Sequence, residues 1–210
     1  MPKPDTEYTS GVDKGPEAPE GSHWMAMFTR TFDFDDIDPQ DISIDDIARG
    51  LGAQPRYLGQ TASPYSVAQH SVAASVLAEE RGHPQHIQFA ALMHDAAEAY
   101  CGDLPRPLKR MLPQYNRIIE HVELEVASKF DYRYPHPAAV KRIDQDVYAY
   151  ERRGISSHPA VDTSDIDPPP KGTMKVLSEC WDFRRARSEF VRRYADYRSM
   201  PDNLSFCLHT

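Results

Sequence analysis

The sequence contains no long apolar run, no Gly-rich phosphate loop and no Cys-x-x-Cys pair. A helix that crosses a bilayer needs about 18 to 20 mostly apolar residues in succession, so we expect no membrane span. The opening M-P-K-P-D-T-E-Y lacks the basic-then-apolar pattern of a signal peptide, which argues against export. The three cysteines, Cys101, Cys180 and Cys207, lack zinc-site spacing and suit a reducing compartment. These absences predict a cytoplasmic protein.

An excess of positive charge is also lacking. The chain has 24 Lys and Arg against 32 Asp and Glu, a formal net charge of −8. Broad binding to a nucleic-acid backbone relies on an extended basic surface, so we expect no extended nucleic acid as a partner. A small phosphorylated ligand needs only a metal and a few local Arg or Lys residues, and it remains compatible with this charge.

The composition that is present predicts one globular domain. The 210 residues are 40% hydrophobic and 27% charged, enough to bury a core without disulfides. Residues 1–24, rich in Pro and Gly, predict a disordered leader, and residues 25–210 predict the domain. The domain begins with a short extended arm and continues as helices. A polar, proline-rich loop is expected at about 154–174, before a last helix at about 175–198.

The stretch 87–101, I-Q-F-A-A-L-M-H-D-A-A-E-A-Y-C, predicts an apolar helix that carries three polar side chains within one turn. They are His94, Asp95 and Glu98. A lone His on such a helix is usually a hydrogen-bonded core residue. A buried charge, however, costs several kcal/mol unless it is paired or binds a metal. The His-Asp pair, with a Glu one turn later, therefore indicates a divalent cation.

Two further helices direct polar side chains inward. S-V-A-Q at 66–69 is a capping box, and His70 follows on the same face as Val67 and Leu77. In the helix predicted from 137 to about 153, Asp144 shares a face with two valines and with Glu151. The residues predicted to bind the metal are His70, His94, Asp95 and Asp144.

Basic residues occur in two predicted loops. The loop at 54–65 carries Arg56 and Tyr57, and D-L-P-R-P-L-K-R at 103–110 carries Asp103 and Lys109. Basic side chains beside a metal could hold phosphate oxygens. A solvated basic turn is an equally good interpretation of each residue taken singly.

The order His70, adjacent His94-Asp95, then Asp144 resembles the signature of HD-domain metal-dependent phosphohydrolases. The segments S-V-A-Q-H-S, L-M-H-D-A-A-E-A-Y-C-G-D-L-P-R-P-L-K and V-K-R-I-D are similar to the subgroup of bacterial 5'-deoxynucleotidases and phage-encoded deoxynucleotide hydrolases. Two positions depart from that subgroup. Tyr57 stands where its members carry Trp, and Gln69 stands where they carry Glu.

The resemblance implies an all-α HD-domain helical bundle that holds one divalent ion among His70, His94, Asp95 and Asp144. It implies Glu98 as a catalytic carboxylate, Asp103 as a catalytic or substrate residue and Arg56 as a phosphate contact. The expected substrate contacts are Arg56, Tyr57, Lys109 and Glu151. Nitrogen and oxygen ligands suit Mn, Co, Fe, Ni or Zn. The resemblance also implies a homo-oligomer in the cytoplasm of a bacterium or, if phage-encoded, of its host.

Three functions stay open at this stage. The first is hydrolysis of a deoxynucleotide, either a monophosphate or a triphosphate. A cyclic-nucleotide or oligonucleotide phosphodiesterase is a second, which would need further His ligands, and His83, His86 and His121 lack the inward alignment. The third is a metal-stabilised module that binds a nucleotide without turnover.

Overall fold

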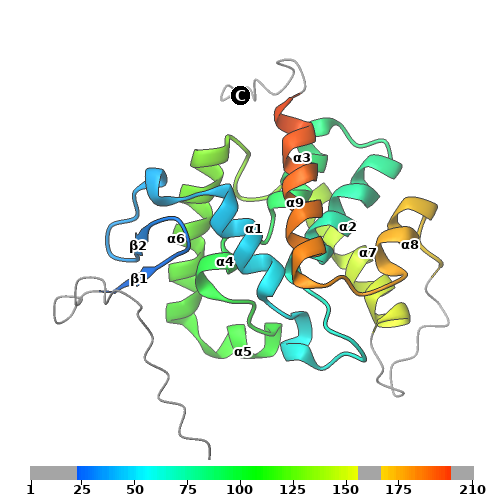
Figure 1. Ribbon diagram of the computed structural model, residues 1–210, viewed down its shortest axis with the longest axis horizontal. Coiled ribbons are helices and arrows are strands. Elements are labelled where there is room, and N and C mark those ends of the chain that lie inside the picture. The colour runs from blue at the N-terminus through cyan, green and yellow to red at the C-terminus, as the bar shows by residue number, and fades with distance from the viewer. Residues whose placement is uncertain (1–22, 156–166, 200–210) are drawn as a thin grey trace, which may run out of the picture.

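The computed structural model describes residues 23–155 and 167–199. Its central element is α2 (Val67–Glu80), which begins where the Ser66 side chain accepts a hydrogen bond from the Gln69 amide. Helix α2 is buried on nearly all sides, because five helices pack against it: α1 (Ile44–Ala53), α3 (Gln85–Met93), α7 (Ala138–Gly154), α8 (Lys171–Leu177) and α9 (Phe183–Arg198). Figure 1 shows α9 crossing in front of α2. The predicted all-α class is confirmed.

The extended arm forms a small antiparallel hairpin, β1 (Trp24–Ala26) and β2 (Thr31–Asp33), with Met25 opposite Phe32. The Phe32 ring is fully buried and stacks on Tyr100 at 4.3 Å between ring centroids. This stacking holds the hairpin against the core. The hairpin lies at one edge of the helical bundle, at the left in Figure 1. The rest of the predicted leader, residues 1–22, lies outside the described residues.

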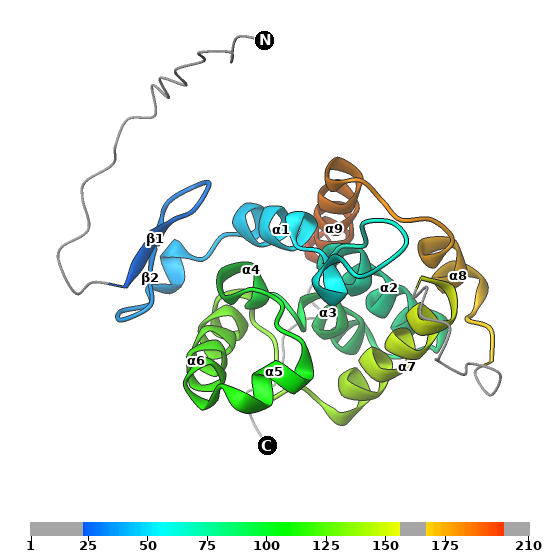
Figure 2. The same ribbon diagram turned by 90° about the horizontal axis from the view of Figure 1, so that it is seen from below.

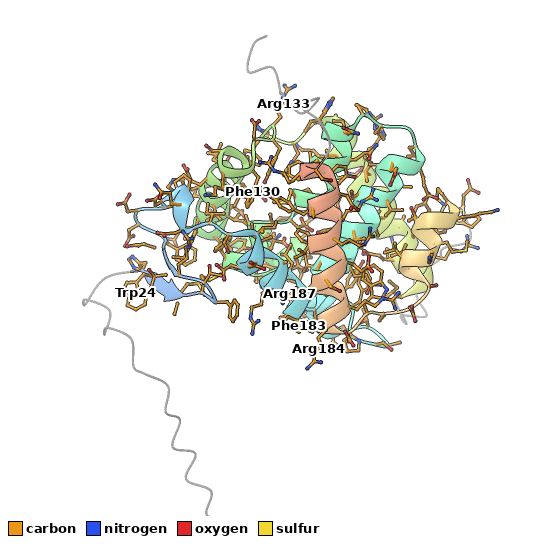
Figure 3. All side chains as sticks on the ribbon, turned by 45° about the horizontal axis from the view of Figure 1, so that its top comes forward. Trp24, Phe130, Arg133, Phe183, Arg184 and Arg187 are labelled. Atoms are coloured by element: carbon orange, nitrogen blue, oxygen red, sulfur yellow. The ribbon has the colours of Figure 1, made fainter. Side chains whose placement is uncertain are left out.

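Helix α1 lies very close to the segment that follows α3. A Cβ atom at Gly50 would stand 2.9 Å from the Ala99 Cβ, and the Ala99 backbone is nearly as close. Glycine at position 50 therefore allows α1 to approach α4 (Glu98–Cys101). Helix α1 also packs against α9, where Phe183 and Arg187 at the start of α9 lie beside Gly52 (Figure 3).

The predicted helix over 87–101 is interrupted, which corrects the expectation of one continuous helix. Helix α3 ends at Met93, and α4 begins at Glu98. Between them the Ala96 amide bonds the Met93 carbonyl at 2.9 Å, a tight i→i−3 turn. The His94 Nδ1 donates to the Ala91 carbonyl at 2.8 Å, the acceptor that the next amide would use in a regular α-helix.

The last predicted helix, 175–198, is also divided. Helix α8 begins at Lys171, inside the predicted loop, and α9 begins after the cap Asp182. The cause is tertiary: the buried Gln69 amide donates to the carbonyls of Val176 and Glu179. It accepts from the Trp181 amide, which holds the linker between α8 and α9 on α2. Most of the predicted loop, residues 156–166, lies outside the described residues.

Helices α5 (Arg106–Met111) and α6 (Pro113–Phe130) pack on each other, and α6 also contacts α4, which in turn packs on α1. Figure 2 shows α4, α5 and α6 to one side of α2, with α7 on the other. Helix α5 was predicted as a loop, and none of its residues is buried. Among the described residues, no helix is both long and apolar enough to cross a bilayer.

Candidate metal and substrate site

Side chains from three helical segments converge beside α2. His70, His94 and Asp95 each offer a ligand atom, and these atoms lie within 4.8 Å of one another. The two Nε2 atoms, of His70 and His94, are 3.2 Å apart. The Asp144 Oδ1 approaches them from α7, at 3.1 Å from His70 Nε2 and 3.7 Å from His94 Nε2. The four residues predicted to bind the metal are therefore close together.

The outer nitrogens of both imidazoles are engaged as donors. His94 Nδ1 must carry a proton, because the Ala91 carbonyl can only accept. His70 Nδ1 donates to the Glu151 carboxylate at 2.6 Å. In neutral imidazoles both Nε2 atoms then present lone pairs to each other and to two carboxylates. A proton on one Nε2 relieves part of this repulsion, whereas a divalent cation engages all four groups at once, so the residues fit a metal.

The electrostatics of the cluster follow from burial opposed by close charges. Burial raises the pKa of Asp95, but His94 and His70 lower it, and the balance lies below its ordinary value. Burial also raises the pKa of Asp144, but hydrogen bonds to both imidazoles lower it, and the result lies below the ordinary value. Both carboxylates are thus ionised at neutral pH and available as oxygen ligands.

Glu151 supports His70 from behind. Its side chain is fully buried; Oε1 accepts from His70 and, at 2.8 Å, from the Tyr65 hydroxyl, while Oε2 accepts from the Tyr57 hydroxyl. The Arg56 Nε lies 3.3 Å from Oε2. Burial raises the pKa of Glu151, but Arg56 and His70 bring it down to about 2. Because this carboxylate fixes the tautomer of a candidate ligand, its position favours an orienting role over the predicted substrate contact.

A cavity of about 460 Å³ opens beside the cluster. This volume is in the range of small-molecule sites, about 300 to 1,000 Å³. Seven of the residues singled out from the sequence line it: Arg56, Tyr57, Asp95, Glu98, Asp103, Lys109 and Asp144. The structure therefore brings two of the four candidate ligands, Asp95 and Asp144, and most of the predicted substrate contacts to one cavity.

Glu98 and Lys109 form an ion pair in the wall of the cavity. The Lys109 Nζ donates to Glu98 Oε1 at 2.6 Å, and Glu98 Oε2 is buried with no hydrogen-bond partner among the described residues. Burial raises the pKa of Glu98, Asp95 and Asp103 raise it further, and Lys109 lowers it without offsetting them. Burial likewise raises the pKa of Asp103. Both carboxyls therefore hold a proton more readily than free ones.

The loop before α2 reaches the cavity through a strained turn. Tyr57 and Leu58 have φ of 57° and 54°, a left-handed backbone conformation that residues other than glycine rarely adopt. The turn places the Arg56 guanidinium 3.5 Å from Asp95 Oδ2. Gln54 then joins the loop to α4, since its amide donates to the Glu98 carbonyl and accepts from the Asp103 amide.

Several residues near the site were missed. Gln145 and Tyr148 line the cavity, and the four-residue spacing from Asp144 could have indicated Tyr148. Beside His94 lies a second, largely buried pair, with Glu123 Oε2 3.5 Å from His136 Nε2. The sequence gives no signal for this pair, because His136 precedes a helix in an irregular segment.

The two departures from the resembled subgroup have clear structural contexts. Gln69 uses both ends of its amide on the linker between α8 and α9, and a carboxylate there could not donate to two carbonyls. Tyr57 uses its hydroxyl on Glu151, a bond that an indole could not reproduce in the same way.

Comparison with known proteins gives two kinds of match. A family model described as 5'-deoxynucleotidase YfbR-like matches residues 60–145, which include all four candidate ligands. The uncharacterized protein YfdR of Escherichia coli (strain K12) is 43% identical over 124 residues, 59% of this chain and 67% of that protein. An uncharacterized protein of Rhodobacter capsulatus is 36% identical over 126 residues, 57% of this chain and 64% of that protein. From the match to YfdR and the family model that spans the candidate ligands, we conclude that the chain belongs to the YfbR-like family of HD-domain proteins.

Proposed function

We propose that this protein is a metal-dependent 5'-deoxynucleotidase. It would hydrolyse a deoxynucleoside 5'-monophosphate to the deoxynucleoside and inorganic phosphate. The observation that carries the proposal is the shared cavity: Asp95 and Asp144 line it together with Arg56, Glu98 and Lys109. The imidazoles of His70 and His94 lie directly behind these two carboxylates, at 3.1 Å from Asp144 and 3.3 Å from Asp95 respectively. The description of the matching family model agrees with this substrate class.

His70, His94, Asp95 and Asp144 would hold the divalent ion. When bound, such an ion polarises a phosphate oxygen and makes water a better nucleophile near neutral pH. The nitrogen and oxygen ligands suit Mn, Co, Fe, Ni or Zn. Glu151 keeps the His70 Nε2 free to bind by accepting a hydrogen bond from Nδ1–H, and the Ala91 carbonyl does the same for His94.

Arg56 and Lys109 would bind the phosphate. The Arg56 guanidinium stands beside Asp95, so a phosphate close to the ion is within its reach. A planar guanidinium can bond two phosphate oxygens at once. Positive charge fixed in this position stabilises the transition state more than the free substrate, because negative charge spreads over the transferring phosphoryl group.

Glu98 and Asp103 would move the protons. Water adds to phosphorus and the bond from phosphorus to the 5' oxygen breaks, so one proton leaves the water and one joins the leaving oxygen. Glu98, whose raised pKa makes it a stronger base and whose partner Lys109 favours its ionised form, accepts the first. Asp103, whose pKa is raised by burial, supplies the second.

A second candidate is a triphosphohydrolase, which would release triphosphate from a deoxynucleoside triphosphate. Arg106 and Arg110 of α5 favour it, because they add positive charge to the same cavity. A longer anionic chain could lie along them. The two activities share the proposed ion and differ in the product.

Product analysis separates these functions. Purified protein with Mn²⁺ is incubated with panels of deoxynucleoside mono- and triphosphates, and phosphate and triphosphate are quantified. Phosphate from monophosphates supports our proposal, and triphosphate from triphosphates supports the second candidate. Neither product, with bound metal confirmed, contradicts both and leaves a binding module. In parallel, Glu98→Ala should abolish turnover with metal content unchanged; an unchanged rate would remove Glu98 from the mechanism.

A further inference from the structure

One aromatic side chain of the cavity has no role in the chemistry proposed above. Tyr148 of α7 lines the cavity, yet 43% of it is exposed to solvent. Its nearest ring and cation partners are loose, with the Tyr57 ring centroid at 6.2 Å and the Arg152 guanidinium at 5.7 Å. A large ring that is half exposed at the edge of a polar cavity is available to a flat ligand.

Tyr148 is also placed at a fixed offset from the candidate metal site. It follows Asp144 by four residues, so both side chains leave the same face of α7. With a rise of 1.5 Å per residue, Tyr148 lies about 6 Å farther along the helix. Asp144 is next to the imidazoles, whereas Tyr148 is more exposed than Asp144. The direction from Asp144 to Tyr148 therefore leads from the candidate ion toward solvent.

We infer that Tyr148 is the stacking surface for the base of the nucleotide, and thus a specificity-determining residue that favours nucleotides over simpler phosphate esters. The inference rests on the proposed function, because it takes the phosphate to lie near Arg56 and Asp144. The ester then extends along α7, and the sugar spans the space between the ion and the ring. A tyrosine face suits this task because every base has a π-face.

The Tyr57 ring is the second aromatic wall, but it is held differently. Its hydroxyl is bonded to the buried Glu151, which anchors the ring. The two rings are tilted by 31°, and their 6.2 Å separation is less than two stacking distances. A base therefore stacks on Tyr148 alone unless that ring moves outward, and its exposure leaves it free to do so. Stacking without hydrogen bonds to the base edge predicts tolerance among the four bases.

The test compares substrates with and without a base. We would measure kcat/KM with Mn²⁺ for four deoxynucleoside monophosphates and for 2-deoxyribose 5-phosphate, which keeps the sugar and phosphate. Tyr148→Ala should lower kcat/KM roughly five- to a hundredfold for every nucleotide and leave the sugar phosphate unchanged. Tyr148→Phe, which keeps the ring, should restore the native ratio, and Tyr148→Leu, which keeps bulk alone, should not. An equal effect on both substrate types, or no effect, overturns the inference while the hydrolysis still stands.

Two controls keep the result specific. The first control is Phe28→Ala, which also removes an exposed ring. Phe28 is 63% exposed and distant in sequence from the cavity-lining residues. This variant should not change the ratio of kcat/KM for nucleotides to kcat/KM for the sugar phosphate. Calorimetric binding of a deoxynucleoside monophosphate to chelator-treated protein gives a readout without turnover. If nothing is hydrolysed but Tyr148→Ala weakens this binding five- to a hundredfold, the proposed reaction fails and the stacking role stands. If neither hydrolysis nor nucleotide binding is found, both fail.

Discussion

The two sides of the cavity are built in different ways. On one side Asp95 and Asp144 line the cavity, and His70, His94 and Glu151 are buried behind them. We call these five residues the ligand wall; they come from segments that pack around the central helix. The α5 wall, residues 103–112, has no buried residue within its helix. Its inner side holds Lys109, and its outer side exposes Met111 at 76%.

This difference separates binding of the ion from handling of the substrate. Each polar group of the ligand wall is fixed by a partner in the core, so a change there alters both the site and the free energy of unfolding. The α5 wall packs mainly on α6, and residues on it can change with little effect on stability. Mutations on the two walls should therefore have different signatures.

The largest effect should come from removing a candidate ligand. His94→Ala takes away one imidazole and should lower activity by about a thousandfold or more, because the ion supplies several kcal/mol to the transition state. The loss should appear together with a fall in bound metal, measured by mass spectrometry of the dialysed protein. Full metal content with no activity would place His94 in the chemistry rather than in the ligand set.

On the α5 wall, Lys109→Met should impair catalysis without unfolding the protein. Lys109 lowers the pKa of the buried Glu98, so its removal raises that pKa further. The rising limb of kcat/KM against pH then shifts to higher pH, and the value at neutral pH falls roughly ten- to a hundredfold. Lys109→Arg, which keeps the charge, should retain most of the profile. A uniform loss at all pH values would assign Lys109 to phosphate binding alone.

Glu151→Gln tests the support of the ligand wall. In the metal-free protein Glu151 has a pKa of about 2, below its ordinary 4.5. Its ionised form therefore stabilises the fold above about pH 4.5, and this contribution, about 3 kcal/mol at most, is lost as the pH falls toward 2. Native and variant unfolding free energies, measured by denaturant titration, should differ at pH 6 and converge as the pH approaches 2.

The same substitution should weaken the ion without removing it. Loss of a carboxylate behind a ligating histidine costs about 10- to 100-fold in metal affinity. Tyr65→Phe, which removes one hydroxyl from Glu151, is the milder control. A constant stability difference across the pH range, or unchanged affinity for Mn²⁺, would contradict the orienting role of Glu151.

The sequence predicted the ligand wall better than the α5 wall. Helical spacing alone turned His70 and Asp144 inward, because burial repeats every three or four residues and these positions follow the apolar stripe. Spacing could not locate the break after Met93, since the segment is rich in good helix formers. That break depends on the His94 ring bonding the Ala91 carbonyl, a side-chain contact that no local pattern encodes.

Long-range contacts account for the other misses. The break between α8 and α9 depends on Gln69, more than 100 residues away, so a continuous helix was the natural prediction from local propensity. The α5 segment was predicted as a loop because Pro105 and Pro107 suggest a turn, yet Pro is compatible with the first turn of a helix. Tyr148 could have been predicted from its spacing to Asp144.

The smallest effect is expected on the outer side of the α5 wall. Met111→Ser replaces the most exposed of the large apolar side chains, and in the monomer it should change the free energy of unfolding by no more than about 0.5 kcal/mol, with kcat/KM unchanged. Leu108 and Leu112 are also more than a third exposed, so the three form an apolar strip on the last turn of α5 and its C-cap residue. The predicted homo-oligomer sharpens this test, because an interface over the strip would make stability depend on protein concentration. Light scattering of native protein and Met111→Ser decides: equal masses leave α5 free of any subunit contact, whereas a lower mass for the variant shows that a second subunit covers it.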